Sequence, residues 1–260
     1  DSDYVREQNK TFVAQEHHIR FYNEQRPGSP IAMQTGVLRI DGDTLKVYQE
    51  MRNIANDNLV ATFISECQLV DLTTREPQPL PGFVAEHSTP VMTELPEHGA
   101  PRGVAVTEPR PSPSLDEAKR LGMSITYRNL LGGADCDRYS FMKTSGYMAC
   151  ISSAIPAVIS ATRGMLSRDK RIGGAALEYR LVYRKTPRLG EHLILCSGFQ
   201  AGGSTTVSWG HWLFDGNSGE CVAGAESVAV MLDLIARKAI TIPDDMYAEL
   251  KSQAISEFSI

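Results

Sequence analysis

The segment GGADCDRYSFMKTSGYMACISSAIPAVIS, which begins at Gly132, contains the residues of this chain best suited to chemistry. Asp135 and Asp137 stand one residue apart, immediately before a long and mostly apolar run. A carboxylate at the entrance of a helix can act as a general base or as a nucleophile in acyl transfer. The free N–H groups of the same helix N-terminus can hold the oxyanion that develops. Two carboxylates this close would also raise the pKa of one of them.

A second interpretation of the same residues needs no chemistry. Aspartate and serine are among the commonest residues at a helix N-terminus, so Asp137 or Ser140 could simply cap the helix that follows. Cys136 has no histidine near it in the sequence to activate a thiolate, which favours a small buried residue over a nucleophile. The catalytic and the capping interpretations both stay open from the residues alone.

Other side chains near this segment could contact a substrate. Tyr139 and Tyr147 could line an acyl pocket or could be core aromatics, and Thr144 could supply a hydroxyl group. Arg184 and Arg188, with their basic neighbours, could bind the phosphates of coenzyme A, since arginine forks suit phosphate geometry. The alternative for these arginines is a solvated basic face.

The composition limits the classes of function. The 260 residues are 42% hydrophobic and 22% charged, which is typical of a soluble globular protein, and the net charge of −5 gives no electrostatic reason to expect nucleic acid. No run of 18 apolar residues predicts a membrane span. The five cysteines are odd in number and form no CxxC pair, which favours reduced thiols and a cytoplasmic location. No histidine has the spacing of a metal site, so we expect no metal.

Aligning the sequence with itself shows an internal repeat at an offset of 162 positions. Glycines, acidic residues and apolar residues fall on their counterparts without a gap over most of each copy. The identical pairs include Ala14 with Ala176, Glu16 with Glu178, Gly28 with Gly190, Gly36 with Gly198, Asp71 with Asp233 and Pro81 with Pro243. This alignment without gaps predicts that the chain contains two copies of one structural unit.

Each copy shows the spacing of consecutive antiparallel strands, with connections too short for a βαβ crossover. We expect a first unit over residues 1–82, a linker with a short helix over 83–121, a second unit over 122–242 and a C-terminal helix and tail over 243–260. Nine of the 14 prolines fall between Pro77 and Pro113, which argues against regular structure in the linker. Residues 142–165 carry almost no charge and predict a buried helix at the start of the second unit.

The first copy lacks the opening of the second. The counterpart of Asp137 would lie at 137 − 162 = −25, before residue 1. A unit without its central helix would expose an apolar face, so we expect that residues preceding the given chain complete it.

This element order resembles the hot-dog fold, in which a curved antiparallel sheet wraps a central helix. The chain is similar to a tandem, or double, hot-dog thioesterase of the 4-hydroxybenzoyl-CoA thioesterase type, which is an α+β architecture. Those enzymes carry an Asp-x-Asp-x-x-Gly-His segment at the helix entrance. Here Asp135 and Asp137 match it, whereas Ser140 and Phe141 stand in place of the Gly-His pair.

The resemblance implies an acyl-CoA thioesterase that acts on an acyl thioester without a cofactor, with coenzyme A as part of the substrate. It implies Asp137 and Asp135 as the catalytic residues and a homo-oligomer, a dimer of double hot-dogs. The implied substrate-binding residues are Tyr139, Ser140, Phe141, Thr144, Tyr147, Arg184 and Arg188. One alternative is a non-catalytic acyl-binding or scaffold protein of the same fold. Another is an enoyl-thioester hydratase, whose Asn-Pro-x-His segment is absent from this sequence.

Overall fold

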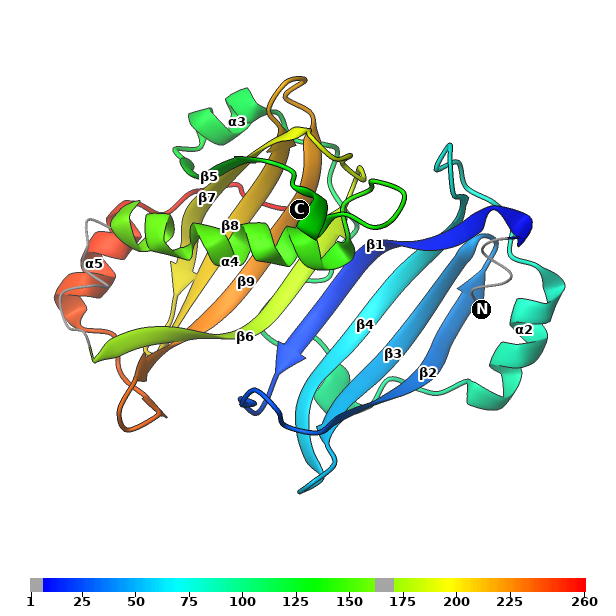
Figure 1. Cartoon of the computed structure of the whole chain (residues 1–260). Coiled ribbons are helices and arrows are strands. Elements are labelled where there is room, and N and C mark those ends of the chain that lie inside the picture. Colours follow the sequence, from blue (N-terminus) through cyan, green and yellow to red (C-terminus); the bar gives the residue numbers. More distant parts are fainter. Residues whose placement is uncertain (1–6, 162–170) are drawn as a thin grey trace. The chain divides into compact units, whose positions relative to one another are not determined.

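The computed structural model describes residues 7–161 and 171–260. The chain divides into two compact units, Asp1–Ala105 and Val106–Ile260 (Figure 1). Each unit contains one antiparallel sheet, and the two are described separately below. The architecture is the double hot-dog fold, as the sequence predicted.

The sheet of the first unit has four strands in the order β2-β3-β4-β1. The strands are β1 (Lys10–Phe21), β2 (Ile31–Asp41), β3 (Thr44–Asn53) and β4 (Asn58–Asp71). The helix α2 (Gly82–Ser88) and the short 3-10 helices η1 (Thr89–Val91) and η2 (Glu97–Gly99) follow. Gly28 and Gly42 adopt positive φ in the β1–β2 and β2–β3 connections, where a side chain would be strained.

The second unit opens with the short helix α3 (Leu115–Arg120), which Ser114 caps by accepting the Glu117 N–H. Its sheet has the order β6-β9-β8-β7-β5, and β10 pairs with β9. The strands are β5 (Ser124–Leu130), β6 (Ile172–Tyr183), β7 (His192–Gly202), β8 (Thr206–Asp215), β9 (Cys221–Asp233) and β10 (Lys238–Ala239). Between β5 and β6 lie η3 (Gly133–Asp135) and the long helix α4 (Thr144–Ala161), and α5 (Asp244–Ser252) closes the unit.

Helix α4 lies across one face of the second sheet (Figure 1). It begins two residues later than the sequence predicted, and residues 162–165 of the expected helix lie outside the described residues. Tyr147 and Ile151 of α4 face Leu181, Leu195 and Leu213 of the sheet, with little space between them. Burying this apolar stripe against the strands is what holds the helix in place.

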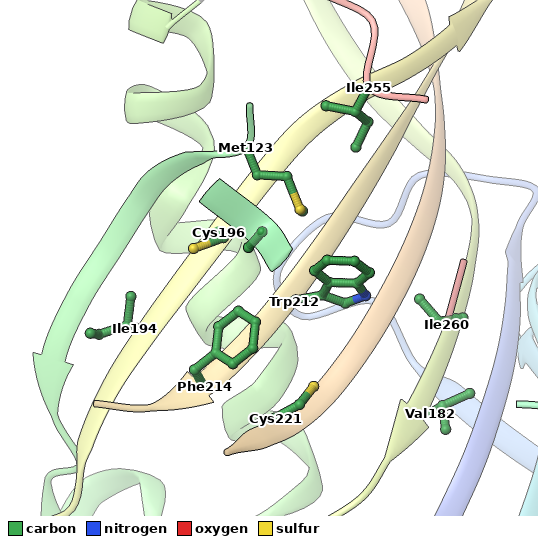
Figure 2. Close-up of a cluster of buried hydrophobic side chains, with 10 residues drawn as sticks. Met123, Val182, Ile194, Cys196, Trp212, Phe214, Cys221, Ile255 and Ile260 are labelled. Atoms are coloured by element: carbon green, nitrogen blue, oxygen red, sulfur yellow. The ribbon is translucent and has the colours of Figure 1, made fainter. Parts of the chain in front are cut away.

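The opposite face of the second sheet carries its own core. Because side chains alternate along a strand, the neighbours of the residues under α4 point away from the helix. Trp212 and Phe214 lie at the centre of this cluster, and Ile255 and Ile260 from the C-terminal end of the chain pack against it (Figure 2). The second sheet is therefore covered on both faces.

The strand pairings confirm the repeat at the level of backbone geometry. A register shift falls between Ala14 and Glu16 in β1 and between Ala176 and Glu178 in β6, both at the offset of 162. The shift between Val37 and Arg39 in β2 recurs between Phe199 and Ala201 in β7. A third shift, between Met51 and Arg52, recurs between Leu213 and Phe214. β-Bulges re-aim the side chains that follow them, so both copies present equivalent positions on equivalent faces.

The repeat also continues into the proline-rich segment. At the same offset α2 corresponds to α5, and each helix follows a proline, Pro81 or Pro243, at its N-cap position. The proline-rich segment thus contains a regular helix, because a proline next to the first turn removes no intrahelical hydrogen bond.

Beyond these helices, residues 91–98, here called the first strap, correspond to residues 253–260, the second strap. The Thr93 N–H donates to the Val37 carbonyl oxygen at 2.9 Å, and the equivalent Ile255 N–H donates to the Phe199 carbonyl oxygen at 2.8 Å. Gly36 and Gly198 lie beneath these two residues, and a Cβ at either glycine would collide with the strap. Each strap therefore lies directly on the backbone of its sheet.

No helix in the described part of the chain is long and apolar enough to cross a membrane.

Candidate functional site

Asp137 lies in a tight loop before α4. One carboxylate oxygen, Oδ1, accepts the N–H groups of Tyr139 at 2.8 Å and Phe141 at 3.0 Å. The backbone closes the same loop, since the Asp137 N–H donates to the Phe141 carbonyl oxygen at 2.8 Å. Both acceptor contacts precede Thr144, the first residue of the helix. The helix-cap interpretation of Asp137 is therefore wrong, and its carboxylate instead fixes the shape of the loop.

Asp135 occupies a different environment from Asp137. It ends η3, and its carbonyl oxygen accepts the N–H of Lys143 at 2.8 Å, next to the first turn of α4. Cys136, which separates the two aspartates, is buried, and burial raises the pKa of its thiol. The two carboxylates thus lie on either side of a buried residue, and Asp135 is the one beside the helix.

Cys150 of α4 and Tyr127 of β5 are near enough to Asp135 for its charge to act on them, although the sequence gave no reason to select them. Burial raises the pKa of the Cys150 thiol to about 11, the hydrogen bond with Tyr127 opposes that rise, and the negative charge of Asp135 adds to it. A thiol with such a pKa is almost wholly protonated at neutral pH and is a poor nucleophile. The cluster therefore leaves the carboxylates as the candidate reactive groups.

The Asp137 loop is anchored to the turn between β6 and β7. The Leu189 N–H donates to the Ser140 carbonyl oxygen at 2.9 Å, and the Met142 N–H donates to that of Pro187 at 2.8 Å. Phe141 is buried beneath the guanidinium group of Arg188, whose central carbon lies 4.3 Å from the ring centroid. Ser140 adopts a φ of 66°, which few residues other than glycine tolerate. The structure thus brings Asp137, Ser140, Phe141 and Arg188 together.

The remaining aromatic and hydroxyl candidates differ in their exposure to solvent. Tyr139 is exposed, and its hydroxyl accepts from Arg138, whose guanidinium also stacks on the ring at 4.8 Å. Tyr147 is buried in the core, where its hydroxyl donates to the Lys185 carbonyl oxygen at 2.7 Å and its ring meets Tyr183 edge-on. Thr144 is exposed at the start of α4. Of the two interpretations of Tyr147, the structure supports the core aromatic.

Arg184 lies apart from this loop. It donates to the carbonyl oxygen of Arg110 at 2.9 Å, on the side of the sheet that carries the Trp212 cluster. Arg180 is 1% exposed and donates to the carbonyl oxygen of Thr107, and Lys185 pairs with Asp215 at 3.3 Å. The basic residues that are close in sequence are therefore distributed among structural contacts, and Arg188 is the one that reaches the Asp137 loop.

A buried polar row that the sequence did not reveal crosses the sheet beneath α4. The Thr126 and Ser197 hydroxyls lie 2.7 Å apart, the Ser197 hydroxyl lies 2.8 Å from His211 Nδ1, and His211 Nε2 lies 3.3 Å from the Ser227 hydroxyl. All four residues are buried, His211 to 2% exposure. Burial lowers the pKa of His211 to about 4, so the imidazole is neutral at pH 7.

We expect this row to make the second unit sensitive to acid. Unfolding returns the pKa of His211 from about 4 to near 6.5, so the unfolded state takes up a proton first as the pH falls. The stability is therefore complete above about pH 6.5 and decreases by about 3 kcal/mol towards pH 4 and below. Both tryptophans, Trp209 and Trp212, lie in the second unit, so denaturant titrations followed by tryptophan fluorescence report on it.

The first unit supplies the matched variant for this measurement. At the position equivalent to His211 it has Gln49, which donates to Thr35, the equivalent of Ser197, at 3.2 Å. His211→Gln therefore introduces a polar side chain that cannot be protonated, and it is the residue that the first unit carries at the equivalent position. Between pH 6.5 and pH 4 the free energy of unfolding of the variant should decrease by about 3 kcal/mol less than that of the wild type. An equal decrease in both proteins would contradict the role assigned to His211.

A family model matches one part of the chain, within the first unit. Residues 1–87 match the model of the thioesterase-like superfamily. No curated protein sequence matches the chain.

Several solved structures share the fold at low sequence identity. The 12:0-ACP thioesterase of Umbellularia californica aligns with a TM-score of 0.62 and 13% identity, over 87% of this chain and 75% of that one. A Lactobacillus plantarum protein assigned as an oleoyl thioesterase aligns with a TM-score of 0.65 and 12% identity, over 94% and 81%. An acyl-ACP thioesterase from Bacteroides thetaiotaomicron aligns at 0.59 and 14%, over 87% and 79%.

Proposed function

We propose that this chain, a tandem hot-dog protein whose residues 1–87 match the model of the thioesterase-like superfamily, is a thioester hydrolase. It would convert an acyl thioester and water into a free acid and a thiol. The observation that carries the proposal is the match of residues 1–87 to that superfamily. The two-unit architecture shared with proteins named acyl-ACP thioesterases supports it at the level of the fold.

Hydrolysis needs a group that activates water or attacks the carbonyl carbon, and donors that stabilise the oxyanion. We assign the first role to the carboxylate of Asp137, with Asp135 as the second candidate. As a base, the carboxylate takes a proton from water, hydroxide adds to the carbonyl carbon, and the thiolate leaves and is protonated. The fixed position of Asp137 Oδ1 supports this role, because a preorganised carboxylate needs no reorientation during the reaction.

The first turn of α4 supplies candidate donors for the oxyanion. Backbone N–H groups at the start of a helix have no partner within it, and the helix dipole adds positive potential there. Thr144 and Ser145 occupy these positions and are exposed. A structure of the complex with a substrate analogue would give the distances from these N–H groups to the substrate oxygen.

Substrate binding is proposed at the surface of the Asp137 loop. Arg188, with Arg138 and Lys143 on the same loop and helix entrance, is exposed and gives this surface positive charge. Such a surface suits the phosphates of coenzyme A or of the phosphopantetheine arm of a carrier protein. Tyr139, Ser140 and Thr144 are exposed there too. For Phe141 and Tyr147 the burial supports a role in shaping the site from beneath, and the contacts of Arg184 give a substrate role no support.

The test is a thiol-release assay on the purified full-length protein. The panel contains acyl-CoA and acyl-carrier-protein thioesters with short, long and aromatic acyl groups. We expect turnover of at least one class, and the carrier that reacts fastest assigns the thiol partner. Failure to release thiol from any member of the panel would contradict the proposal.

A non-catalytic acyl-binding protein is the second candidate. The observation that favours it is the replacement of the family's Gly-His pair by Ser140 and Phe141, of which Phe141 is buried under Arg188. Calorimetric binding of a non-hydrolysable acyl-CoA analogue, together with no turnover of the matching thioester, would support this candidate over the hydrolase.

A further inference from the structure

The first strap meets its sheet through charged groups at the positions where the second strap meets an apolar core. At the offset of 162, Trp212 corresponds to Glu50, Gly210 to Tyr48 and Ile260 to His98. In the second unit, Ile260 and Trp212 belong to one buried cluster. The first unit therefore carries a set of titratable residues where its copy has none.

His98, the last residue of the first strap and part of η2, contacts a carboxylate of the sheet. Its Nε2 lies 2.6 Å from Glu50 Oε1, and the Tyr48 hydroxyl donates to the same oxygen at 2.9 Å. Arg52 donates to the other oxygen, Oε2, from Nε at 3.0 Å and from Nη2 at 2.8 Å. Burial acts to raise the pKa of Glu50, but the hydrogen bonds from His98, Tyr48 and Arg52 outweigh it and hold that pKa below its usual value. Glu50 is therefore a carboxylate at neutral pH.

The Tyr48 hydroxyl also lies 3.2 Å from His98 Nε2, whereas the groups from β1 contact the backbone of His98 and not its ring. From β1, Arg20 donates to the carbonyl oxygens of His98 at 2.6 Å and Ala100 at 2.9 Å. The Tyr22 hydroxyl also donates to the His98 carbonyl oxygen. From β4, the residue in register with Arg20 and Glu50 is the uncharged Thr62. The imidazole itself is 44% exposed to solvent.

The first strap forms one wall of a groove. The groove has a volume of about 370 Å³ and runs between the strap and strands β2 and β3. Met92, Thr93 and Glu94 line the strap side, whereas Gly36, Tyr48 and Glu50 line the sheet side. Glu50 thus belongs both to the contact with His98 and to the floor of the groove.

We propose that His98 is a pH-dependent clasp that fastens the first strap to β3 and so controls the width of this groove. When the imidazole is protonated, its contact with Glu50 is an ion pair, and ionised hydrogen bonds are stronger than neutral ones. When the imidazole is neutral, the bonds to the His98 carbonyl oxygen remain and the strap opens more often. Histidine is the side chain suited to changes of charge between acidic and mildly basic pH, so the experiment compares these two conditions.

Hydrogen–deuterium exchange of the full-length protein tests the clasp. Exchange is measured by mass spectrometry at pH 5.5 and pH 8.0 and corrected for the intrinsic pH dependence of amide exchange. We expect peptides from the first strap to be protected about threefold more at pH 5.5, the size expected of a partly exposed ion pair. Peptides from the second strap, held by apolar contacts, should show equal protection at both pH values.

Two variants make the result specific. His98→Gln retains a neutral donor towards Glu50 but cannot be charged, so its first strap should show the lower protection at both pH values. His87→Gln removes another histidine of the first unit, whose Nδ1 contacts the carbonyl oxygen of Phe83, and should keep the wild-type response. The proposal is overturned by equal protection at both pH values in the wild type, by a retained response in His98→Gln, or by a parallel response of both straps.

Discussion

Replacing Asp137 with asparagine is expected to lower kcat for thiol release by about 100-fold or more, which is the usual contribution of a general base. The asparagine carbonyl oxygen can still accept the N–H groups of Tyr139 and Phe141, so the loop should keep its shape. The substitution therefore removes the charge and the basicity without removing the structural role.

Asp137→Ala completes this comparison, since alanine removes the loop contacts as well as the charge. If Asp137 is the base, asparagine and alanine should both abolish most of the activity. If Asp137 only shapes the loop, asparagine should be close to the wild type and alanine should be impaired. Asp135→Asn tests the second carboxylate, and Asp116→Asn, on the exposed face of α3, is the control for a lost surface charge.

Asp137→Asn with full activity would overturn the assignment of the base. A loss in Asp135→Asn alone would transfer the role to the carboxylate beside Cys150 and Tyr127. Circular dichroism and a melting temperature for each variant distinguish a catalytic loss from a folding defect, because asparagine is not expected to change either.

Trp212→Ala is expected to lower the free energy of unfolding of the second unit by about 3–5 kcal/mol, as large truncations of buried aromatic residues do. Trp212 is fully buried and its ring stacks on Phe258 at 4.9 Å. Its Nε1–H donates to the Ser259 carbonyl oxygen at 3.2 Å, and the Arg110 guanidinium lies 5.3 Å from the ring centroid. The side chain thus joins the sheet to the second strap and to the segment that precedes α3.

Denaturant unfolding followed by the fluorescence of the remaining Trp209 measures this loss. Trp212→Phe, which keeps an aromatic ring but removes the N–H donor, should cost less than alanine. Exchange of the second strap should increase with alanine, because its anchor is gone. A loss below about 1 kcal/mol for Trp212→Ala would contradict the central position assigned to this residue, since surface substitutions have effects of that size.

The sequence predicted the fold because its signals are local and repeated. Glycines and apolar residues recur at one offset, so Gly28 and Gly190 identified equivalent turns without knowledge of any contact. The correspondence of α2 with α5 was hidden, because beyond Pro81 and Pro243 the two segments share little sequence and the prolines suggested irregular structure.

The candidate site was less predictable because it depends on contacts between distant residues. The Asp137 loop is shaped by the turn at Pro187–Leu189, which is far away in the sequence. His211 and Ser197 lie on neighbouring strands, and a single polar residue in a strand gives no sign of the partner it will meet. Arg184 and Arg188 are neighbours in the sequence, yet they contact the carbonyl oxygen of Arg110 and the ring of Phe141.

The shared bulges make each half of the chain an internal standard for the other. Because the backbone register is the same, two equivalent positions can be compared in side chain and in burial on one path of the chain. Glu50 is equivalent to Trp212, and Gln49 is equivalent to His211, so one chain carries two different residues at each of these positions of the repeat. Duplication has thus allowed the faces of this scaffold to diverge in chemistry while the path of the chain was kept.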